Sequence, residues 1–167
     1  MRKNIENTLL NKIQELPVLK DTIAGWRENG QKVVFTNGVF DLLHIGHITY
    51  LAQAAELGDK LIIGLNSDSS VKRIKGDTRP INRQDSRAAL LAALFFVDAV
   101  ALFEEDTPLA LITTLMPDVL VKGADYTIEN IIGAKEVMAN GGEVKTINFV
   151  EGHSSTSIIQ KIKDHTK

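Results

Sequence analysis

Short runs of apolar residues alternate with helical patterns along most of the chain. The runs have the length of strands and are apolar throughout, which is typical of parallel strands buried on both faces of a sheet. They predict strands near residues 33–36, 60–65, 98–103, 118–121 and 143–149. Because each run is followed by a turn and a helical segment, we expect an α/β fold. The pattern favours a Rossmann-like, doubly wound sheet of five parallel strands in the order 3-2-1-4-5.

Helix signals fill the intervals between these strands. We expect helices from about residue 44 to Gly58, over 83–95, from Pro108 onward, over 129–138, and from residue 154 onward. The first of these is expected to bury Ile48, Leu51, Ala52 and Ala55. The last is expected to pack three isoleucines on the body, Ile158, Ile159 and Ile162.

The N-terminal part of the chain lacks chemical motifs. Residues 1–28 predict a helical extension broken at Pro17, ahead of one domain over residues 29–167. The inward face of the extension is expected to contain Leu9, Ile13, Leu16, Ile23 and Trp26. We find no internal repeat, low-complexity tract or linker, so a single domain with this extension is the predicted organisation.

Composition narrows the class of protein. With 167 residues, 44% of them hydrophobic, the chain is long enough for one ordinary core. The net charge of −2 provides no general attraction to nucleic acid or anionic membranes, so any affinity for phosphate must be local. Without cysteine there is no disulfide framework, thiolate zinc site or cysteine nucleophile. No segment has the apolar run of a signal peptide or membrane span, and we expect a cytoplasmic protein.

The densest set of chemical side chains follows the first predicted strand. His44 and His47 begin the next helix, and a spacing of three places both imidazoles on one face. A helix N-terminus also offers unpaired N–H groups and the positive end of the helix dipole, which suit a phosphate chain. Gly46 lets a nucleotide approach the backbone. The alternatives are histidines that only cap or pack the helix, and a zinc site, for which neither His153 nor His165 is an obvious third ligand.

Other polar segments follow later strands and should share this edge of the sheet. Residues 71–80 hold four cations beside a glycine and a proline, and predict a loop over the site in which Lys75 or Arg79 contacts phosphate. A solvated charged loop is the alternative. Lys122 follows the fourth strand, beside the point where the winding reverses. Hydroxyls at residues 154–157 begin the last helix, where they can cap it or bind phosphate.

These motifs resemble a known family. Residues 44–47 match the HxGH signature of the nucleotidylyltransferase superfamily. Class I aminoacyl-tRNA synthetases share the tetrapeptide, but they need a lysine-rich loop and a tRNA-binding domain for which this length leaves no room. The wider set of motifs resembles the bacterial adenylyltransferases of D-glycero-β-D-manno-heptose 1-phosphate; it comprises residues 36–41, 66–68, 75–80, 87, 121–126 and 152–156. Many of those relatives carry a sugar kinase domain first, and this sequence resembles a stand-alone form.

The resemblance implies a reaction and a set of site residues. AMP would pass from ATP to the heptose 1-phosphate, giving ADP-heptose and pyrophosphate for lipopolysaccharide or other surface-glycan synthesis. Mg²⁺ would arrive with ATP, without a certain protein ligand, and the enzyme would be a homodimer that binds neither nucleic acid nor membrane. The implied catalytic residues are His44, His47 and Lys122. The implied nucleotide contacts are Thr36, Asn37, Gly38, Phe40, Gly46, Asp125, Ser154, Ser155 and Thr156. The implied acceptor contacts are Asp41, Lys75, Arg79 and Arg87.

Two other functions stay open from the sequence. A cytidylyltransferase of glycerol 3-phosphate would share the phosphate-binding residues, although related cytidylyltransferases carry an arginine in the region that here ends in Glu151. His153 stands where a small or apolar residue is expected. A nucleotide-binding domain without turnover is the other alternative. The acidic cluster Glu104, Glu105 and Asp106 favours a solvated loop over a Mg²⁺ site.

Overall fold

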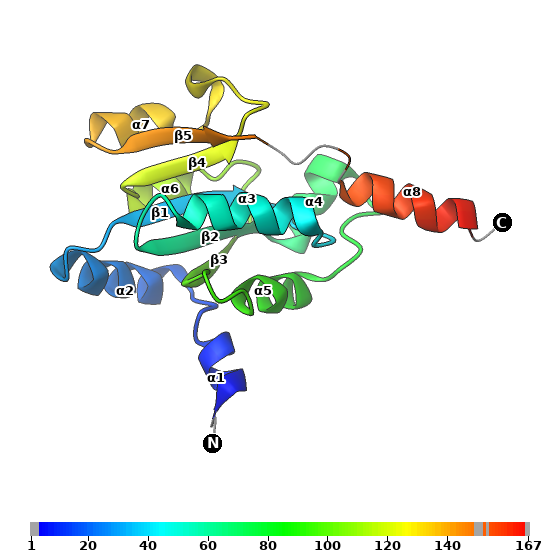
Figure 1. Cartoon of the computed structure of the whole chain (residues 1–167), viewed down its shortest axis with the longest axis horizontal. Coiled ribbons are helices and arrows are strands. Elements are labelled where there is room, and N and C mark those ends of the chain that lie inside the picture. The colour runs from blue at the N-terminus through cyan, green and yellow to red at the C-terminus, as the bar shows by residue number, and fades with distance from the viewer. Residues whose placement is uncertain (1–3, 149–151, 153, 166–167) are drawn as a thin grey trace.

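A five-stranded, all-parallel sheet with the order β3-β2-β1-β4-β5 forms the centre of the protein (Figure 1). The computed structural model describes residues 4–148, 152 and 154–165. The sheet confirms the predicted fold class and strand order. The last strand ends at residue 147, and Phe149, where it was predicted to end, lies outside the described residues. The strands are β1 (Val33–Gly38), β2 (Lys60–Asn66), β3 (Ala99–Phe103), β4 (Val119–Gly123) and β5 (Glu143–Ile147).

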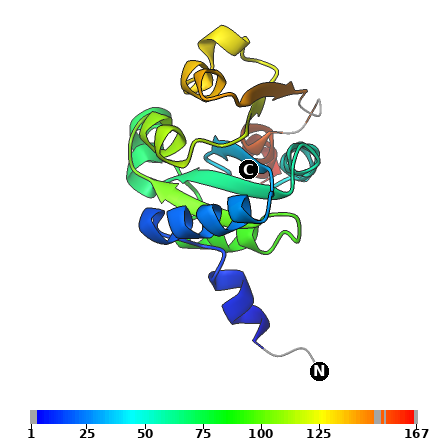
Figure 2. The same ribbon diagram turned by 90° about the vertical axis from the view of Figure 1, so that its left-hand side faces the viewer.

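Helices cover both faces of this sheet (Figure 2). One face packs against α2, α6 and α7, with Phe35 and Ile62 of the sheet at its centre. The other packs against α3 and α5, around Val34 and Ile63. The helices are α1 (Ile5–Leu10), α2 (Leu16–Glu28), α3 (Ile45–Ala55), α4 (Asp68–Lys75), α5 (Gln84–Ala92), α6 (Leu109–Leu115), the 3₁₀ turn η1 (Ile128–Asn130), α7 (Ala134–Ala139) and α8 (Ser155–His165).

Several helices differ from the sequence-based expectation. The charged segment predicted as a loop over residues 71–80 contains α4 up to residue 75. Its helix-forming signal is local: the Ser67 hydroxyl caps the N-terminus by accepting from the Ser70 amide at 3.2 Å, and Asp68 lies in the positive first turn. The helix predicted over 83–95 ends at residue 92. The one predicted over 129–138 divides into η1 and α7.

The buried face of α3 also differs from the prediction. Tyr50, Leu51 and Ala54 are buried, whereas Ile48, Ala52 and Ala55, which were predicted to be buried, are half-buried. Most of this helix is apolar or small, so hydrophobic periodicity alone does not determine which side faces the sheet. The last helix, α8, extends away from the sheet in Figure 1. Its Ile162 is 57% exposed, contrary to the expected packing on the body.

The N-terminal segment contributes to the core. Leu19 and Ile23 of α2 are buried in the same cluster as the sheet residues. Between α1 and α2 the chain pairs with the outer edge of β3: the Val100 amide donates to the Lys12 carbonyl at 2.8 Å, and the Gln14 amide donates to the Val100 carbonyl at 2.9 Å. The helical break therefore precedes Pro17, which lies in the first turn of α2. A domain division at residue 28 stays a prediction.

Candidate active site

A cleft of about 740 Å³ lies at the carboxyl ends of β1 and β4. α3, which follows β1, packs on one face of the sheet, and α7, which follows β4, packs on the other. The cleft therefore lies at the switch point, where ligands bind in open parallel sheets. Of the site residues predicted from the sequence, all except Thr36 and Arg87 line it. The structure thus brings these residues together, while their individual roles stay predictions.

The two histidines of the HxGH motif lie at the start of α3. His44 is the N-cap residue, and its ring stacks on that of His47 with centroids 3.8 Å apart and planes 24° apart. Burial lowers the pKa of His47 to about 4, with a further contribution from the neighbouring His44. A hydrogen bond between the ring and the Leu42 backbone raises the pKa in part. His47 is therefore a neutral imidazole at pH 7, and its buried Nδ1 has no hydrogen-bond partner among the described residues.

The loop between β1 and the histidines is strained. Phe40 has a φ of 46°, in the left-handed region that side chains rarely adopt. Its ring meets the edge of His47 at 5.2 Å and lies over Gly38, where an added Cβ would be 2.9 Å from Phe40 Cε2. A side chain at position 38 would therefore force the Phe40 ring to shift. The buried Oδ1 of Asn37 has no hydrogen-bond partner among the described residues, so this loop also offers an acceptor to a ligand. Strain of this kind collects at functional sites.

Lys122 lies at the opposite side of the switch point, at the end of β4. Burial lowers the pKa of its ammonium to about 8, although the nearby Asp125 raises it in part. The Nζ atom also lies 5.9 Å from the centre of the Tyr126 ring. A lysine that is partly desolvated in this way gains more from an anionic ligand than one in water.

Tyr50 is a cleft residue that the sequence analysis did not single out. Its hydroxyl lies 2.7 Å from the hydroxyl of Thr36, which is fully buried and does not reach the cleft. Burial raises the pKa of Tyr50 to about 12, so the phenol keeps its proton. The signal was present, because Tyr50 follows His47 by three residues and so lies on the same helical face. Further cleft residues outside the predicted set are Val39, Asn66, Ile74, Asp106, Pro108, Gly123, Tyr126, Asn130, Ile131 and Ile132.

The N-terminus of α8 closes another side of the cleft. The Ser155 hydroxyl donates to the Leu42 carbonyl at 3.1 Å, which connects this helix to the HxGH loop. Ser154 and Ser157 cap each other, with the Ser157 amide donating to Ser154 Oγ at 3.0 Å and the Ser154 amide donating to Ser157 Oγ at 3.2 Å. Thr156 lines the cleft beside them. Hydroxyls and helix N–H groups here suit phosphate oxygens.

Two predicted acceptor-binding residues are bound to each other. Asp41 Oδ2 accepts from Arg79 Nε at 2.6 Å, and the carboxylate also accepts from the Ile81 and Asn82 amides at 2.8 and 2.9 Å. Burial alone would raise the pKa of Asp41, but these hydrogen bonds hold it below its ordinary value. Arg87, in contrast, is fully buried outside the cleft, and protein oxygens accept from its guanidinium.

The acidic cluster after β3 is partly paired. Arg73 Nε donates to Asp106 Oδ1 at 2.7 Å, and Nη2 of the same arginine donates to the Glu104 carbonyl. In the part of the chain that the structure describes, no group of three or more His, Asp or Glu side chains is placed to hold a metal ion. Within those same residues, none of the helices is long and apolar enough to cross a membrane.

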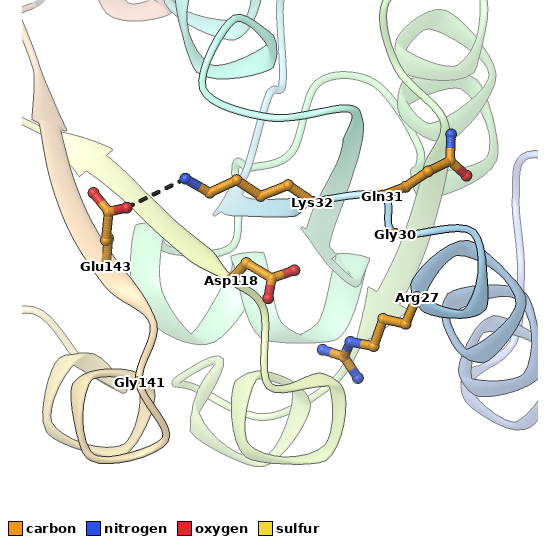
Figure 3. A pocket seen from close by; sticks show the side chains of 7 residues that line it. All are labelled: Arg27, Gly30, Gln31, Lys32, Asp118, Gly141 and Glu143. Carbon is orange, nitrogen blue, oxygen red and sulfur yellow. Dashed lines mark hydrogen bonds and ion pairs between the residues drawn. The ribbon is translucent and has the colours of Figure 1, made fainter.

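A second, smaller hollow of about 390 Å³ lies at the amino ends of β1, β4 and β5 (Figure 3). Lys32 Nζ there pairs with Glu143 Oε1 at 3.2 Å. Asp118 Oδ2 accepts from the Val33 amide at 2.8 Å. Arg27 donates to the Leu115 carbonyl at 3.0 Å and also to the Met116 carbonyl at the end of α6. The charged groups of Lys32, Asp118 and Arg27 thus bind other groups of the protein.

Comparison with known proteins agrees with this geometry. The family model described as Cytidylyltransferase-like matches residues 35–161. "Bifunctional protein HldE" of Cronobacter sakazakii is 56% identical over 148 residues, which is 89% of this chain and 31% of the relative. The protein of the same name from Escherichia coli is 56% identical over 149 residues, with the same coverage. The chain thus spans about a third of the length of these curated relatives.

Two solved structures are also similar. The lipopolysaccharide core biosynthesis protein of Thermoplasma volcanium is 31% identical with a TM-score of 0.58, covering 74% of this chain and 100% of that protein. Pantoate-beta-alanine ligase of Francisella tularensis is 16% identical with a TM-score of 0.59, covering 93% of this chain and 78% of that one, and supports the fold alone. With the family model spanning most of the domain and the HxGH histidines at the cleft, the chain belongs to the cytidylyltransferase-like family of nucleotidyltransferases.

Proposed function

We propose that the protein transfers AMP from ATP to D-glycero-β-D-manno-heptose 1-phosphate, giving ADP-heptose and pyrophosphate for surface-glycan synthesis. One observation carries this proposal. The stacked histidines at the start of α3 share a single cleft with Lys122 and with the hydroxyls that begin α8. Two helix N-termini, a partly desolvated ammonium and the two stacked imidazoles together suit a triphosphate.

The proposed chemistry needs no general base. An oxygen of the sugar phosphate attacks the α-phosphorus of ATP, the new P–O bond forms, and the bond to the β-phosphate oxygen breaks as pyrophosphate leaves. The nucleophile is already an anion, so the protein supplies alignment and stabilises negative charge. His44, His47 and Lys122 would stabilise the oxygens of the reacting phosphate, while Ser154, Ser155 and Thr156 would bind the leaving pyrophosphate.

The remaining cleft residues complete this assignment. Arg79 and Lys75 would contact the acceptor phosphate from the side of α4. Asn37, Gly38, Phe40, Gly46 and Asp125 would surround the nucleotide. Mg²⁺ would enter as part of the ATP complex. Because Asp41 and Asp106 are already paired with arginines, we expect triphosphate oxygens and water to be its main ligands.

Similarity favours this acceptor over an alditol phosphate. The chain's motifs resemble heptose 1-phosphate adenylyltransferases, and its relatives include proteins named HldE and one named for lipopolysaccharide core biosynthesis.

We further propose a cytoplasmic homodimer, as expected for related enzymes. Phe95, which is 91% exposed, offers apolar surface for such pairing. Sedimentation velocity of the wild type and of Phe95→Ser tests this proposal. We expect a concentration-dependent dimer in the wild type and a monomer in the variant.

Pyrophosphate release with Mg²⁺ tests the reaction. ATP and CTP are each combined with heptose 1-phosphate and with glycerol 3-phosphate. The proposal predicts release with ATP and the heptose phosphate. Release with CTP and glycerol 3-phosphate would agree with the proposed nucleotidyl transfer but would show that both proposed substrates are wrong. Nucleotide binding without release in any combination would favour a domain that binds ATP without turnover.

A further inference from the structure

Arg87 is a fully buried arginine whose hydrogen bonds connect four segments around the cleft. Its Nη1 donates to the Val39 carbonyl at 2.7 Å and to the Asn66 carbonyl at 2.9 Å. Its Nε donates to the Asn82 carbonyl at 3.0 Å, and its Nη2 pairs with Asp68 Oδ1 at 2.8 Å. The guanidinium fork therefore joins the loop after β1, the end of β2, the start of α4 and the segment before α5.

A second buried contact lies next to this one. Residues 79–82, which we call the strap, are held by the Asp41 carboxylate through Arg79 Nε and the amides of Ile81 and Asn82. Asn82 Nδ2 also donates to the Asp41 carbonyl at 3.0 Å. Asp41 thus binds three residues of the strap, and Arg87 binds the carbonyl of its last residue, Asn82. The strap is fixed at both ends of its contact with the β1 loop.

Two cleft cations lie on the segments that these anchors hold: Arg79 on the strap and Lys75 on α4. The bond from Arg79 to Asp41 uses Nε, and the described part of the chain offers no hydrogen-bond partner to the two Nη groups. Lys75 lies at the end of α4, whose first residue is Asp68. Both cations line the cleft. Arg79 is anchored to the Asp41 carboxylate through Nε alone.

We propose that Arg87 is a positioning residue for the acceptor phosphate, acting through the strap and α4 on Arg79 and Lys75. The inference rests on the proposed function, and it replaces the direct contact between Arg87 and substrate that the sequence indicated. Because Arg87 supplies bonds to three carbonyls and one carboxylate from one rigid plane, lysine cannot reproduce its geometry. Of its four bonds, only the one to Val39 holds the nucleotide loop, while those to Asn82 and Asp68 hold the strap and α4. Its loss should therefore affect binding of the acceptor more than binding of ATP.

The test compares Arg87→Lys with Arg83→Lys, a matched change at an exposed arginine one turn earlier. Arg87→Lys is expected to raise the KM for the acceptor about tenfold while the KM for ATP stays within about twofold. In an Arg79→Ala background the same change should add less than about twofold, because both substitutions act on one contact. Arg83→Lys should leave both KM values unchanged. A lower Tm with unchanged acceptor KM in Arg87→Lys would overturn the proposal.

A measurement without turnover separates this proposal from the proposed function. The Nε–H of Arg79, hydrogen-bonded to Asp41, should give a protected signal in ¹⁵N NMR spectra, assigned by its absence in Arg79→Lys. We expect its hydrogen exchange to be at least about tenfold faster in Arg87→Lys and unchanged in Arg83→Lys. Unchanged exchange in Arg87→Lys would contradict the positioning. If the wild type turns over no acceptor, the proposed function fails, and this exchange rate still decides the positioning.

Discussion

The two ends of the sheet differ in how most of their ionisable groups are held. At the amino end, Lys145 and Lys32 hold the pKa of Glu143 below its ordinary value, so its partners favour its charged form. At the carboxyl end, burial moves the pKa of Lys122 down to about 8, that of His47 down to about 4 and that of Tyr50 up to about 12. Each of these shifts favours the neutral form; in the cleft Asp41 is the exception, because Arg79 and two backbone amides favour its charged form. Polar groups in the cleft are thus buried beside partners that offset only part of their lost hydration.

This difference distinguishes a structural hollow from a reactive one. Paired surface charges contribute little and are screened by solvent. Partly compensated buried groups cost stability, and they repay that cost only when a ligand supplies the missing charge or hydrogen bond. An anion such as a triphosphate would supply both to Lys122 and the histidines. Substitutions at the two ends should therefore have very different consequences.

The largest expected effect follows from removing one imidazole. His47→Ala should lower kcat by about 100- to 1000-fold, the usual cost of losing one donor to the charge that develops in the transition state. ATP affinity, measured by calorimetry, should change far less. His165→Ala is the matched control, because that histidine is exposed on α8. Unchanged turnover in His47→Ala would contradict the role assigned to this residue.

Lys122 should give the cleft a pH dependence. Its pKa of about 8 means that the ammonium is charged below that pH and neutral above it, so kcat/KM should fall as pH rises through about 8. Lys122→Arg keeps the charge at all these pH values and should remove this fall. Lys122→Met should lower kcat/KM by about 100-fold below pH 8, and the difference from the wild type should shrink above it. A fall that persists unchanged in Lys122→Arg would assign the titration to another group.

A smaller effect is expected beneath the cleft. Thr36→Val removes the buried partner of the Tyr50 hydroxyl, and should lower the free energy of unfolding by about 1 kcal/mol. Urea denaturation measures this change. Thr114→Val, at an exposed position of α6, makes the same chemical replacement and should have a smaller effect. Equal losses in the two variants would show that the hydrogen bond to Tyr50 is not a particular source of stability.

The smallest effect is expected at the amino end. Lys32→Ala breaks a pair whose side chains are 42% and 50% exposed, and exposed pairs contribute little to stability. Its Tm and its kcat/KM should match those of the wild type. A clear loss of activity in this variant would place a function at the amino end and would remove the contrast between the two hollows.

The sequence predicted the sheet and most of the cleft because both depend on local signals. Continuous apolar runs identify buried parallel strands, and the fold then brings residues that follow β1 and β4 to one edge. Arg87 could not be placed, because the partners of a buried guanidinium are backbone carbonyls from distant segments. The burial of Thr36 outside the cleft could not be predicted either, because its hydrogen-bond partner Tyr50 lies on another element. α4 was missed because its cap and first turn outweigh a composition typical of a loop.

Hydrogen exchange with mass spectrometry, with and without MgATP, tests the central claim that the carboxyl-end cleft is the nucleotide site. The amides around residues 37–47 and 122–126 should become protected when MgATP binds, while those around residues 27–32 and 141–143 should not change. His47→Ala should reduce that protection by less than it reduces turnover. Protection confined to the amino-end segments, with none around the HxGH motif, would contradict the account.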